Sequence, residues 1–305
     1  MVAMSAEAVH VPVLLREVLE LLALGPGSRC IDATIDGGGH ATAMLAATAP
    51  GGRVLGIDRD ATLLAVSRDR LQAAVDSGRL QLVQGSFRHL EGIVAASAFP
   101  PADAILFDLG VSSFHFDRSG RGFSFARDEP LDMRFDPTGE SAAPAAELLA
   151  TLDARALTEL LRTYGEERFA SRIARTIIAR RRETPITTTG ALRDAVATAL
   201  PAGRRWQAAR HTARVFQALR IAVNDELAAL AAALPQAVDA LAPGGRLAVI
   251  AFHSLEDRLV KTFLREQQHV GRLRTLTKKP ITPGVDEVAV NPRAASAKLR
   301  AAAKP

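Results

Sequence analysis

The sequence of 305 residues contains a single cysteine, Cys30. One cysteine excludes an internal disulfide and a cysteine-rich zinc site, and no metal site is expected. No apolar run reaches the roughly 18 residues that cross a bilayer, and the first residues lack the basic and apolar segments of a signal peptide. We therefore expect a cytoplasmic protein that has no membrane partner.

Lysine is scarce as well: it occurs at five positions, and arginine supplies the other positive charges. The net charge is +5 at pH 7. Because the planar guanidinium group matches the geometry of phosphate oxygens, this excess favours a nucleic-acid partner. An arginine-rich overall composition would produce the same excess, so both interpretations stay open at this point.

The most informative short segment is CIDATIDGGGH, residues 30–40. An apolar, strand-like start leads into Gly37, Gly38 and Gly39, and an alanine-rich segment follows. This order predicts a strand, a tight turn and the N-terminus of a helix. Such a turn can hold a phosphate, a dinucleotide or another nucleoside-bearing cofactor, so the turn alone does not identify the ligand.

Short apolar segments alternate with helical spacers in the first third of the chain, and one more follows a turn near the C-terminus. The first four start roughly 20 to 27 residues apart, which suits right-handed βαβ units and a parallel, doubly wound sheet. The predicted strands lie within Arg29–Thr34, Arg53–Asp58, Leu80–Gln84, Ala104–Leu109 and Leu241–Phe252.

The α/β pattern is interrupted after the fourth strand. Residues 114–133 are predicted to form a loop, helical periodicity runs from Ala145 to about Ala199, and one long alanine- and leucine-rich helix is predicted from about Arg210 to Leu241. We therefore expect a helical substrate-recognition domain inserted into an α/β domain. The predicted parts are residues 1–117, 118–214 and 215–305.

Polar residues at the strand ends indicate the cofactor, because ligands of such sheets bind at the carboxyl ends of the strands. Asp58 ends the second strand at the position expected to hold ribose hydroxyls, as NAD or S-adenosylmethionine would require. Contiguous glycines and the carboxylate of Asp32 favour the cationic sulfonium of S-adenosylmethionine, while an NAD-dependent oxidoreductase is the alternative. Phe87 follows the third strand, where its ring would stack on adenine or belong to the core.

Longer motifs resemble one specific family, the bacterial small-subunit (16S) ribosomal RNA cytosine-N4-methyltransferases. The similar stretches extend over nearly the whole chain and are much longer than general methyltransferase motifs. They are HVPVLL, DGGGH, GIDRD, FDLGVSS, RGFSFARDEPLDMRFD, TYGEERFASRIAR, VFQALRIAVNDEL, LAPGGRLAVIAFHSLEDR and NPRAASAKLR.

The resemblance implies a class I methyltransferase fold, which is a Rossmann-like doubly wound sheet, with an inserted helical domain. It implies S-adenosylmethionine as methyl donor and a cytidine in the decoding centre of 16S rRNA, within the small ribosomal subunit, as target. A homodimer is a further partner that the resemblance leaves open. The cofactor-binding residues that it implies are Gly38, Gly39, His40, Asp58, Phe87, Asp108 and His115.

Four positions depart from the family pattern. Ala33 and Asp36 stand where the family usually has glycine, so the first turn is expected to sit differently around the methionine end of the cofactor. Glu129 replaces a common glycine, and Ala295 replaces a common arginine. We expect these departures to concern cofactor affinity rather than family membership.

The residues also restrict the chemistry. Methylation at carbon five of a pyrimidine requires a cysteine nucleophile, and Cys30 is expected to be buried in the first strand. A nitrogen or oxygen acceptor remains, for which we expect Asp108, Ser112 and nearby backbone carbonyls to act in catalysis. A rival outside enzymes is an RNA-binding ribosome assembly factor with a vestigial cofactor site.

Arginines of the predicted insert are candidates for contacts with RNA phosphates, and a solvated helix face is the alternative explanation for them. Single-stranded or looped RNA would present a splayed base to such a protein. The candidate residues are Arg162, Arg168, Arg172, Arg175, Arg180, Arg181 and Arg182.

Overall fold

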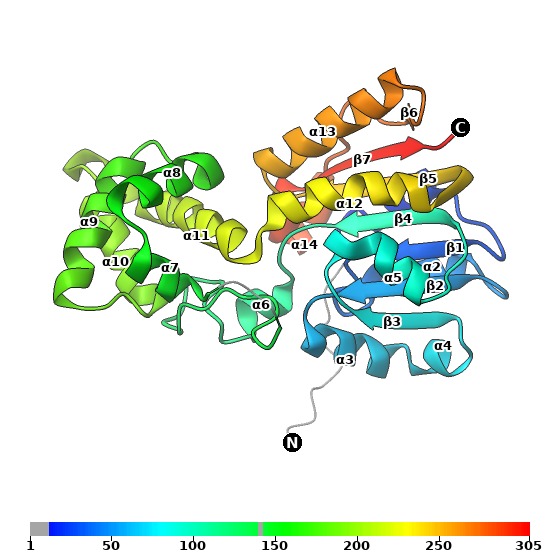
Figure 1. The fold of residues 1–305 in the computed structure, drawn as a ribbon, viewed down its shortest axis with the longest axis horizontal. Helices are drawn as coiled ribbons and strands as arrows, with labels where there is room; N and C mark the ends of the chain where they lie inside the picture. The colour runs from blue at the N-terminus through cyan, green and yellow to red at the C-terminus, as the bar shows by residue number, and fades with distance from the viewer. Residues whose placement is uncertain (1–11, 140–142) are drawn as a thin grey trace. The chain divides into compact units, whose positions relative to one another are not determined.

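The computed structural model describes residues 12–139 and 143–305, and the chain divides into two compact units (Figure 1). The first unit comprises Met1–Gly110 and Leu227–Pro305, and the second comprises Val111–Glu226. The predicted boundary at residue 214 falls inside the continuous helix α11 (Ala208–Asn224), so a domain boundary cannot lie there. His10 and Val11 of the HVPVLL motif lie outside the described residues.

The first unit contains a seven-stranded sheet in the order β3-β2-β1-β4-β5-β7-β6. Strands β1 to β5 are parallel, whereas β7 is antiparallel to both of its neighbours. The dinucleotide-binding order 3-2-1-4-5-6 is therefore modified by one antiparallel strand, which confirms the expected class I methyltransferase fold. The strands are β1 (Arg29–Asp32), β2 (Arg53–Asp58), β3 (Leu80–Gln84), β4 (Ala102–Asp108), β5 (Leu241–Ala251), β6 (Arg274–Thr275) and β7 (Lys298–Ala303).

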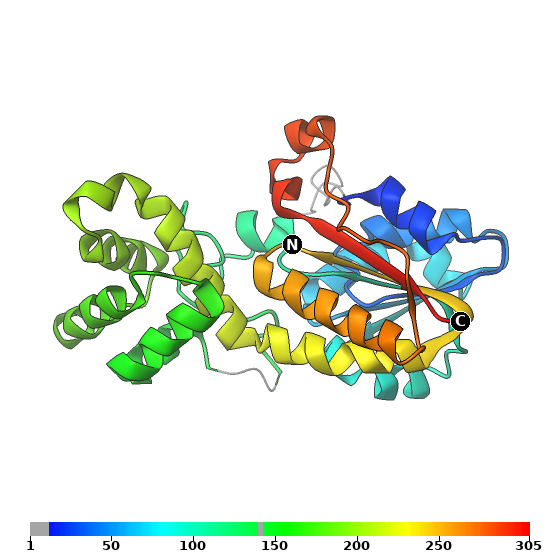
Figure 2. The ribbon, with the colours of Figure 1, turned by 90° about the horizontal axis from the view of Figure 1, so that it is seen from above.

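Helices cover both faces of this sheet (Figure 2). One hydrophobic cluster joins the sheet to α5, α12 and α13, and another joins the opposite face to α1, α2 and α3. The helices of the unit are α1 (Leu15–Leu22), α2 (Gly39–Ala47), α3 (Ala61–Arg70), α4 (Gln72–Asp76), η2 (Phe87–His89), α5 (Leu90–Ala96), α12 (Glu226–Ala240), α13 (Ser254–His269), α14 (Val285–Val290) and η4 (Pro292–Ser296).

Burial on both faces explains why these strands are continuous apolar runs. Successive side chains of a strand point to opposite faces, so Ile105 and Phe107 enter the cluster that contains α12, whereas Leu106 enters the cluster that contains α2. A parallel sheet with both faces covered is expected to show this pattern. The five predicted strands are confirmed, while β6 and β7 were not predicted.

The second unit is helical and has its own hydrophobic core. The antiparallel bridge between Pro130 and Thr188 joins its long loop to the segment before α10. The helices of this unit are α6 (Ser113–Asp117), α7 (Ala145–Thr151), α8 (Ala154–Gly165), α9 (Ala170–Glu183), α10 (Thr189–Ala199), η3 (Ala202–Gln207) and α11 (Ala208–Asn224).

Two sequence predictions in this region were wrong. The single long helix expected from Arg210 to Leu241 is two helices, α11 and α12, because Asp225 adopts a left-handed conformation with φ 51°. Asp tolerates this conformation better than most residues, and Arg220 on α11 forms a bidentate ion pair with Glu226 just beyond the break. The loop expected at residues 114–133 begins inside the short helix α6.

Within the described parts of the chain, no helix combines the length and the apolar character that a membrane crossing needs.

Arg181 has a structural role, although the sequence placed it among the candidate RNA contacts. Its guanidinium donates hydrogen bonds to the carbonyl oxygens of Leu149 and Leu152 in the last turn of α7. These carbonyls have no partner within their own helix. We predict that Arg181→Ala lowers the free energy of unfolding by about 1.5 to 3 kcal/mol, the usual value of hydrogen bonds to a charged group.

The adjacent Arg182 is exposed and provides a matched control. Thermal melting followed by circular dichroism should show a lower melting temperature for Arg181→Ala and one near wild type for Arg182→Ala. Equal melting temperatures for the two variants would contradict the structural role.

Candidate active site

The glycine turn after β1 is shaped by the protein's own packing. Gly37 and Gly38 have φ of 76° and 81°, which residues with a side chain rarely adopt. A Cβ on Gly38 would lie 3.0 Å from the Leu71 side chain, and one on Gly39 would lie 3.2 Å from Pro12. The turn thus has no side chains at its three glycines, and α2 begins at Gly39.

Asp36 belongs to the same left-handed run, with φ 41°. This conformation favours glycine, the residue that the family resemblance implies at this position, and Asp36 adds a carboxylate there. The backbone N–H of Asp36 donates to Oδ2 of Asp58 at 3.1 Å. The carboxyl group of Asp36 therefore lies beside that of Asp58.

Asp32 ends β1 and is 1% exposed. One of its carboxylate oxygens, Oδ1, accepts a hydrogen bond from the backbone N–H of Thr34 at 3.3 Å, while Oδ2 has no hydrogen-bond partner. Burial raises the pKa of this carboxyl to about 8, and the nearby carboxylates Asp108, Asp58 and Asp36 raise it further. The sheet edge therefore holds a buried carboxyl group with one oxygen that makes no hydrogen bond to the described residues.

Asp58 ends the neighbouring strand β2 and is half-buried. Its oxygens accept hydrogen bonds from the backbone N–H groups of Asp36 at 3.1 Å and Asp60 at 2.9 Å. Burial is the main cause that raises its pKa to about 7. Asp58 does not cap the following helix: the N-cap of α3 is Asp60, whose side chain accepts from the N–H of Thr62.

Asp108 and His40 form a buried pair, which sequence reasoning did not foresee. Asp108 ends β4, and its Oδ2 lies 3.4 Å from Nδ1 of His40 on α2. The other ring nitrogen of His40, Nε2, lies 3.1 Å from the carbonyl oxygen of Val13. A carbonyl only accepts, so Nε2 carries a hydrogen, and the other ring nitrogen, Nδ1, faces the carboxylate of Asp108.

Thr34 fixes the backbone beside this pair. Its hydroxyl oxygen lies 2.6 Å from the backbone nitrogen of Asp108 and accepts the N–H. The hydrogen bond ties the loop after β1 to the end of β4, so Asp32 and Asp108 share one anchored edge. The residue type gave no sequence signal, because threonine is ordinary at a strand end.

Phe87 lies in η2 directly after β3 and is half-buried. Its ring contacts Phe107 edge to face, with centroids 5.5 Å apart. Part of the ring therefore belongs to the core, as the alternative interpretation expected. The half-exposed ring leaves the predicted stacking on adenine as a proposal.

Ser112 and His115 lie in the second unit and cap α6. The Ser112 hydroxyl accepts the N–H of His115 at 3.4 Å, and Nδ1 of His115 accepts the N–H of Ser112 at 3.2 Å. The imidazole also packs against Phe123 and Phe135. This reciprocal capping gives both residues a structural task, and the predicted catalytic and cofactor roles remain predictions.

The other departures from the family pattern have different surroundings. Oε2 of Glu129 accepts the N–H of Gly122 at 3.1 Å, so this side chain holds the loop that a glycine would leave open. Ala33 is buried, with its N–H donated to the carbonyl of Leu106, whereas Ala295 is exposed.

Cys30 is buried as predicted. Burial, followed by the charges of Asp103 and Asp32, raises the pKa of its thiol to about 12. The thiolate is the nucleophilic form of cysteine, and at neutral pH this group stays protonated. Cys30 therefore has neither the access nor the ionisation that attack on a pyrimidine ring needs.

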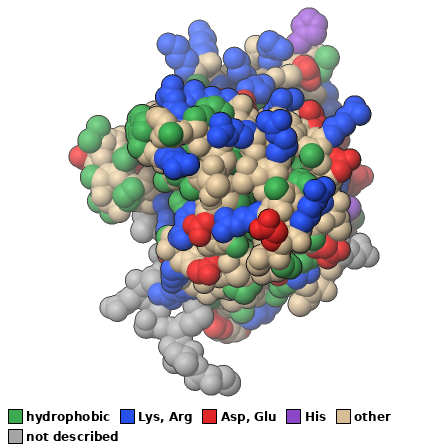
Figure 3. Space-filling view, turned by 90° about the vertical axis from the view of Figure 1, so that its left-hand side faces the viewer, with side chains coloured by type: hydrophobic (Ala, Val, Ile, Leu, Met, Phe, Trp, Pro, Cys, Tyr) green, Lys and Arg blue, Asp and Glu red, His purple; other side chains and the backbone are tan. Residues whose placement is uncertain are grey.

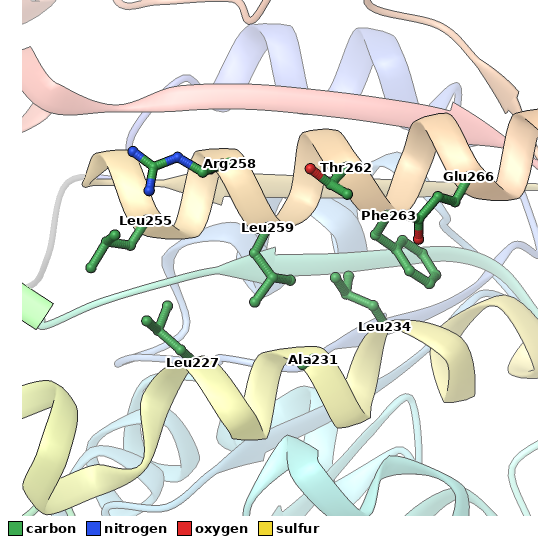
Figure 4. Close-up of a pocket in the computed structure, with 9 residues that line it drawn as sticks. All are labelled: Leu227, Ala231, Leu234, Leu255, Arg258, Leu259, Thr262, Phe263 and Glu266. Carbon is green, nitrogen blue, oxygen red and sulfur yellow. The ribbon is translucent and has the colours of Figure 1, made fainter. Parts of the chain in front are cut away.

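A separate cavity of about 430 Å³ lies between α12 and α13 (Figure 4). Leucine and phenylalanine side chains from the two helices face each other across it, and its polar lining residues are Arg258, Thr262 and Glu266. None of the predicted cofactor residues lines this cavity, so it is distinct from the carboxylate-rich sheet edge.

The sheet edge fits S-adenosylmethionine. Carboxylates converge at the ends of β1, β2 and β4, and the free oxygen of Asp32 is the kind of group that a sulfonium or ammonium cation would satisfy. A pyrophosphate would instead add negative charge to this edge, which disfavours the NAD alternative. Asp58 at the end of β2 and Phe87 just after β3 suit the ribose and the base of a nucleoside.

The shifted pKa of Asp32 predicts a pH-dependent stability. Its folded pKa of about 8 lies above the ordinary value of 3.8, so its contribution to stability is full below about pH 4 and is lost as pH rises through 8. We predict that Asp32→Asn raises the melting temperature of the ligand-free protein relative to wild type, more at pH 9 than at pH 5.

Asp103 offers a control with the opposite sign. Its ion pair with Arg29, at 2.9 Å, lowers the pKa of Asp103, so this group stabilises the fold above its unfolded pKa. Asp103→Asn should lower the melting temperature at pH 9. If Asp32→Asn also lowered it at pH 9, the assignment of Asp32 as a strained carboxylate would be wrong.

Comparisons with known proteins show the family of this chain. The model of the MraW methylase family matches residues 7–305. The "Ribosomal RNA small subunit methyltransferase H" of Thermomicrobium roseum is 51% identical over 96% of this chain and 93% of its own length. The protein of the same name from Heliobacterium modesticaldum is 46% identical over 97% and 98%. The chain therefore belongs to the MraW methylase family and is an S-adenosylmethionine-dependent methyltransferase.

Proposed function

We propose that this enzyme methylates the exocyclic N4 amine of a cytidine in the decoding centre of 16S rRNA, in the cytoplasm. The names of its relatives support rRNA of the small subunit as the substrate class. The buried pair of Asp108 and His40 at the end of β4 is the observation on which the chemical part of the proposal rests.

The position of the acceptor atom follows from what the chain lacks. Attack on carbon five needs a thiolate, and the thiol of Cys30 is buried with a pKa raised to about 12. The exocyclic amine needs no covalent adduct, but its lone pair is delocalised into the ring. A carboxylate that accepts a hydrogen bond from the amine favours the pyramidal, more nucleophilic nitrogen.

S-adenosylmethionine, when bound, supplies an electrophilic methyl group on a sulfonium. The residues of this chain that would hold it are Asp32 beside the cationic part, Asp58 at the ribose and Phe87 at the adenine. Gly38 and Gly39, where a Cβ would press on Leu71 and Pro12, would place the start of α2 beside the ligand. Asp36 would lie at the methionine end of the cofactor. There it would alter the affinity for the cofactor, compared with a relative that has glycine at this position.

Asp108 is the residue that we assign to the amine. Its carboxylate would accept an N–H of the cytosine and orient the nitrogen, and the methylated nitrogen must afterwards release one proton. The pair of Asp108 and His40 can take that proton, because Nδ1 of His40 and Oδ2 of Asp108 face each other at 3.4 Å. His40 is thus a positioning residue that holds Asp108 through the Val13 carbonyl.

The helices of the second unit carry the positive charge that an RNA substrate needs. Residues 154–224 contain 14 arginines and five acidic residues, a net charge of +9, although the whole chain carries only +5. Lysine and arginine side chains gather on the upper part of the face shown in Figure 3, whereas acidic groups lie mainly on its lower part and along its edges. Of the seven candidate arginines, those exposed to solvent are Arg162, Arg168, Arg172, Arg175 and Arg182.

The product of the reaction tests the proposal. Small ribosomal subunits from cells that lack this protein are incubated with the enzyme and a labelled donor, and the rRNA nucleosides are separated by mass spectrometry. We expect label in N4-methylcytidine. Label in 5-methylcytidine or in a ribose-methylated nucleoside would refute the acceptor, and unlabelled rRNA would leave an assembly factor as the better description.

Single-turnover methyl transfer at saturating donor separates the roles of Asp108 and Cys30. Asp108→Ala should lower the rate at least tenfold, because an interaction that favours the transition state is removed. Cys30→Ser should keep a rate close to wild type, with only a small loss of stability. An inactive Cys30→Ser that folds and binds cofactor would overturn the amine mechanism, and an unchanged rate for Asp108→Ala would reduce Asp108 to a binding residue.

A further inference from the structure

Trp206 is the single tryptophan of the chain. Its side chain is large and apolar, yet the residue is 77% exposed to solvent. It lies in η3, between α10 and α11. Its indole Nε1 donates a hydrogen bond to the carbonyl oxygen of Gly203 at 3.1 Å. The ring is therefore held by its own turn while remaining open to solvent.

An exposed tryptophan loses the stabilisation that burial would give, by about 1.5 to 3 kcal/mol for a large apolar side chain. Nothing in the packing of the second unit requires the ring, since it is absent from the core cluster. A polar residue at this position would serve the turn equally well. The exposed ring thus suggests contact with a partner.

Arginines surround the ring in the sequence and at the surface. Arg204, Arg205 and Arg210 are exposed, and all three lie within four residues of Trp206. No acidic residue lies between positions 195 and 224. The positive charge around the ring therefore favours an anionic partner over a neutral one.

The arginine surface continues onto α9. The ring of His211, next to Arg210, contacts the ring of Phe169 at a centroid distance of 5.2 Å. Arg168 directly precedes Phe169, and the exposed Arg172 lies in the first turn of α9. The start of α11 and the start of α9 thus lie side by side within the second unit.

We propose that Trp206 is a stacking platform for an unpaired base of the RNA substrate, with Arg204, Arg205 and Arg210 on the flanking phosphates. This inference rests on the proposed function in that it takes RNA as the substrate. Aromatic rings bind single-stranded RNA by stacking on splayed bases, and basic side chains follow the backbone. A duplex has no free base face to offer.

Because the chain has no other tryptophan, the intrinsic fluorescence of the wild-type protein reports on this residue alone. The probe is a 12-nucleotide single-stranded RNA of mixed sequence, with the duplex of the same sequence for comparison. We expect saturable quenching by the single strand and protection of the ring from acrylamide. The duplex should bind more weakly and quench little.

Affinity measurements on variants separate stacking from charge. Trp206→Ala should weaken binding of the single strand by about 5- to 100-fold, the range for loss of one stacked base, and Trp206→Phe should restore most of it. The salt dependence should not change in either variant. The double variant Arg204→Gln/Arg205→Gln should instead reduce the salt slope by about 1.4, at roughly 0.7 per phosphate contact.

Val285→Ala, at a position 86% exposed in the first unit, is the control for an exposed apolar side chain and should bind RNA like wild type. Unchanged affinity for Trp206→Ala would overturn the inference even if N4-methylcytidine is formed as proposed. A shift of the Trp206 fluorescence spectrum that occurs with small ribosomal subunits, but does not occur with naked RNA, would assign the ring to a protein contact. That result would also overturn the inference. Quenching by RNA without any methylated product would instead count against the proposed function alone.

Discussion

The constraint on which the rest of the site depends is the burial of several carboxyl groups at one edge of the sheet. Asp32, Asp58 and Asp108 end three adjacent strands, and Asp36 joins them from the glycine turn. Burial removes the hydration that would stabilise their charges, and mutual repulsion adds to the cost. The raised pKa values of Asp32 and Asp58 are the consequence.

Hydrogen bonds that involve the backbone hold the residues of this cluster in place. Asp58 accepts two N–H groups, Asp32 accepts one, and the N–H of Asp108 is held by the Thr34 hydroxyl. A cationic ligand would offset the carboxylate charge that these hydrogen bonds do not stabilise. Under the proposed function, the same charges that cost stability in the free protein would favour a sulfonium over a neutral thioether.

The sequence alone was sufficient to predict those elements whose residue pattern has a local physical cause. The central strands were predictable because both faces of a parallel sheet are buried, and the glycine turn was predictable because its backbone is left-handed. Strand β7 was missed because KLRAAA has an alanine run typical of helices, and its strand state comes from pairing with β5. The helix break at Asp225 was missed because the residues on both sides favour helix.

Residue roles were less predictable than elements. Asp58 and Asp108 could be named from their positions at strand ends, but the contact of His40 with Asp108 joins residues far apart in the sequence. Arg181 and Arg182 are adjacent and chemically identical, yet only Arg181 reaches the carbonyls of α7. Such distinctions depend on tertiary packing, which no sequence period encodes.

Proton release on cofactor binding tests the central claim most directly. Calorimetric titrations at pH 7.5, in buffers of different ionisation enthalpy, count the protons that leave the protein when S-adenosylmethionine or S-adenosylhomocysteine binds. Because Asp32 has a pKa of about 8 in the free protein, a cation beside it should release about one proton. The account predicts proton release with both ligands, because both carry the ammonium group of the amino-acid part, and more release with the sulfonium, whereas zero release for both ligands would contradict it.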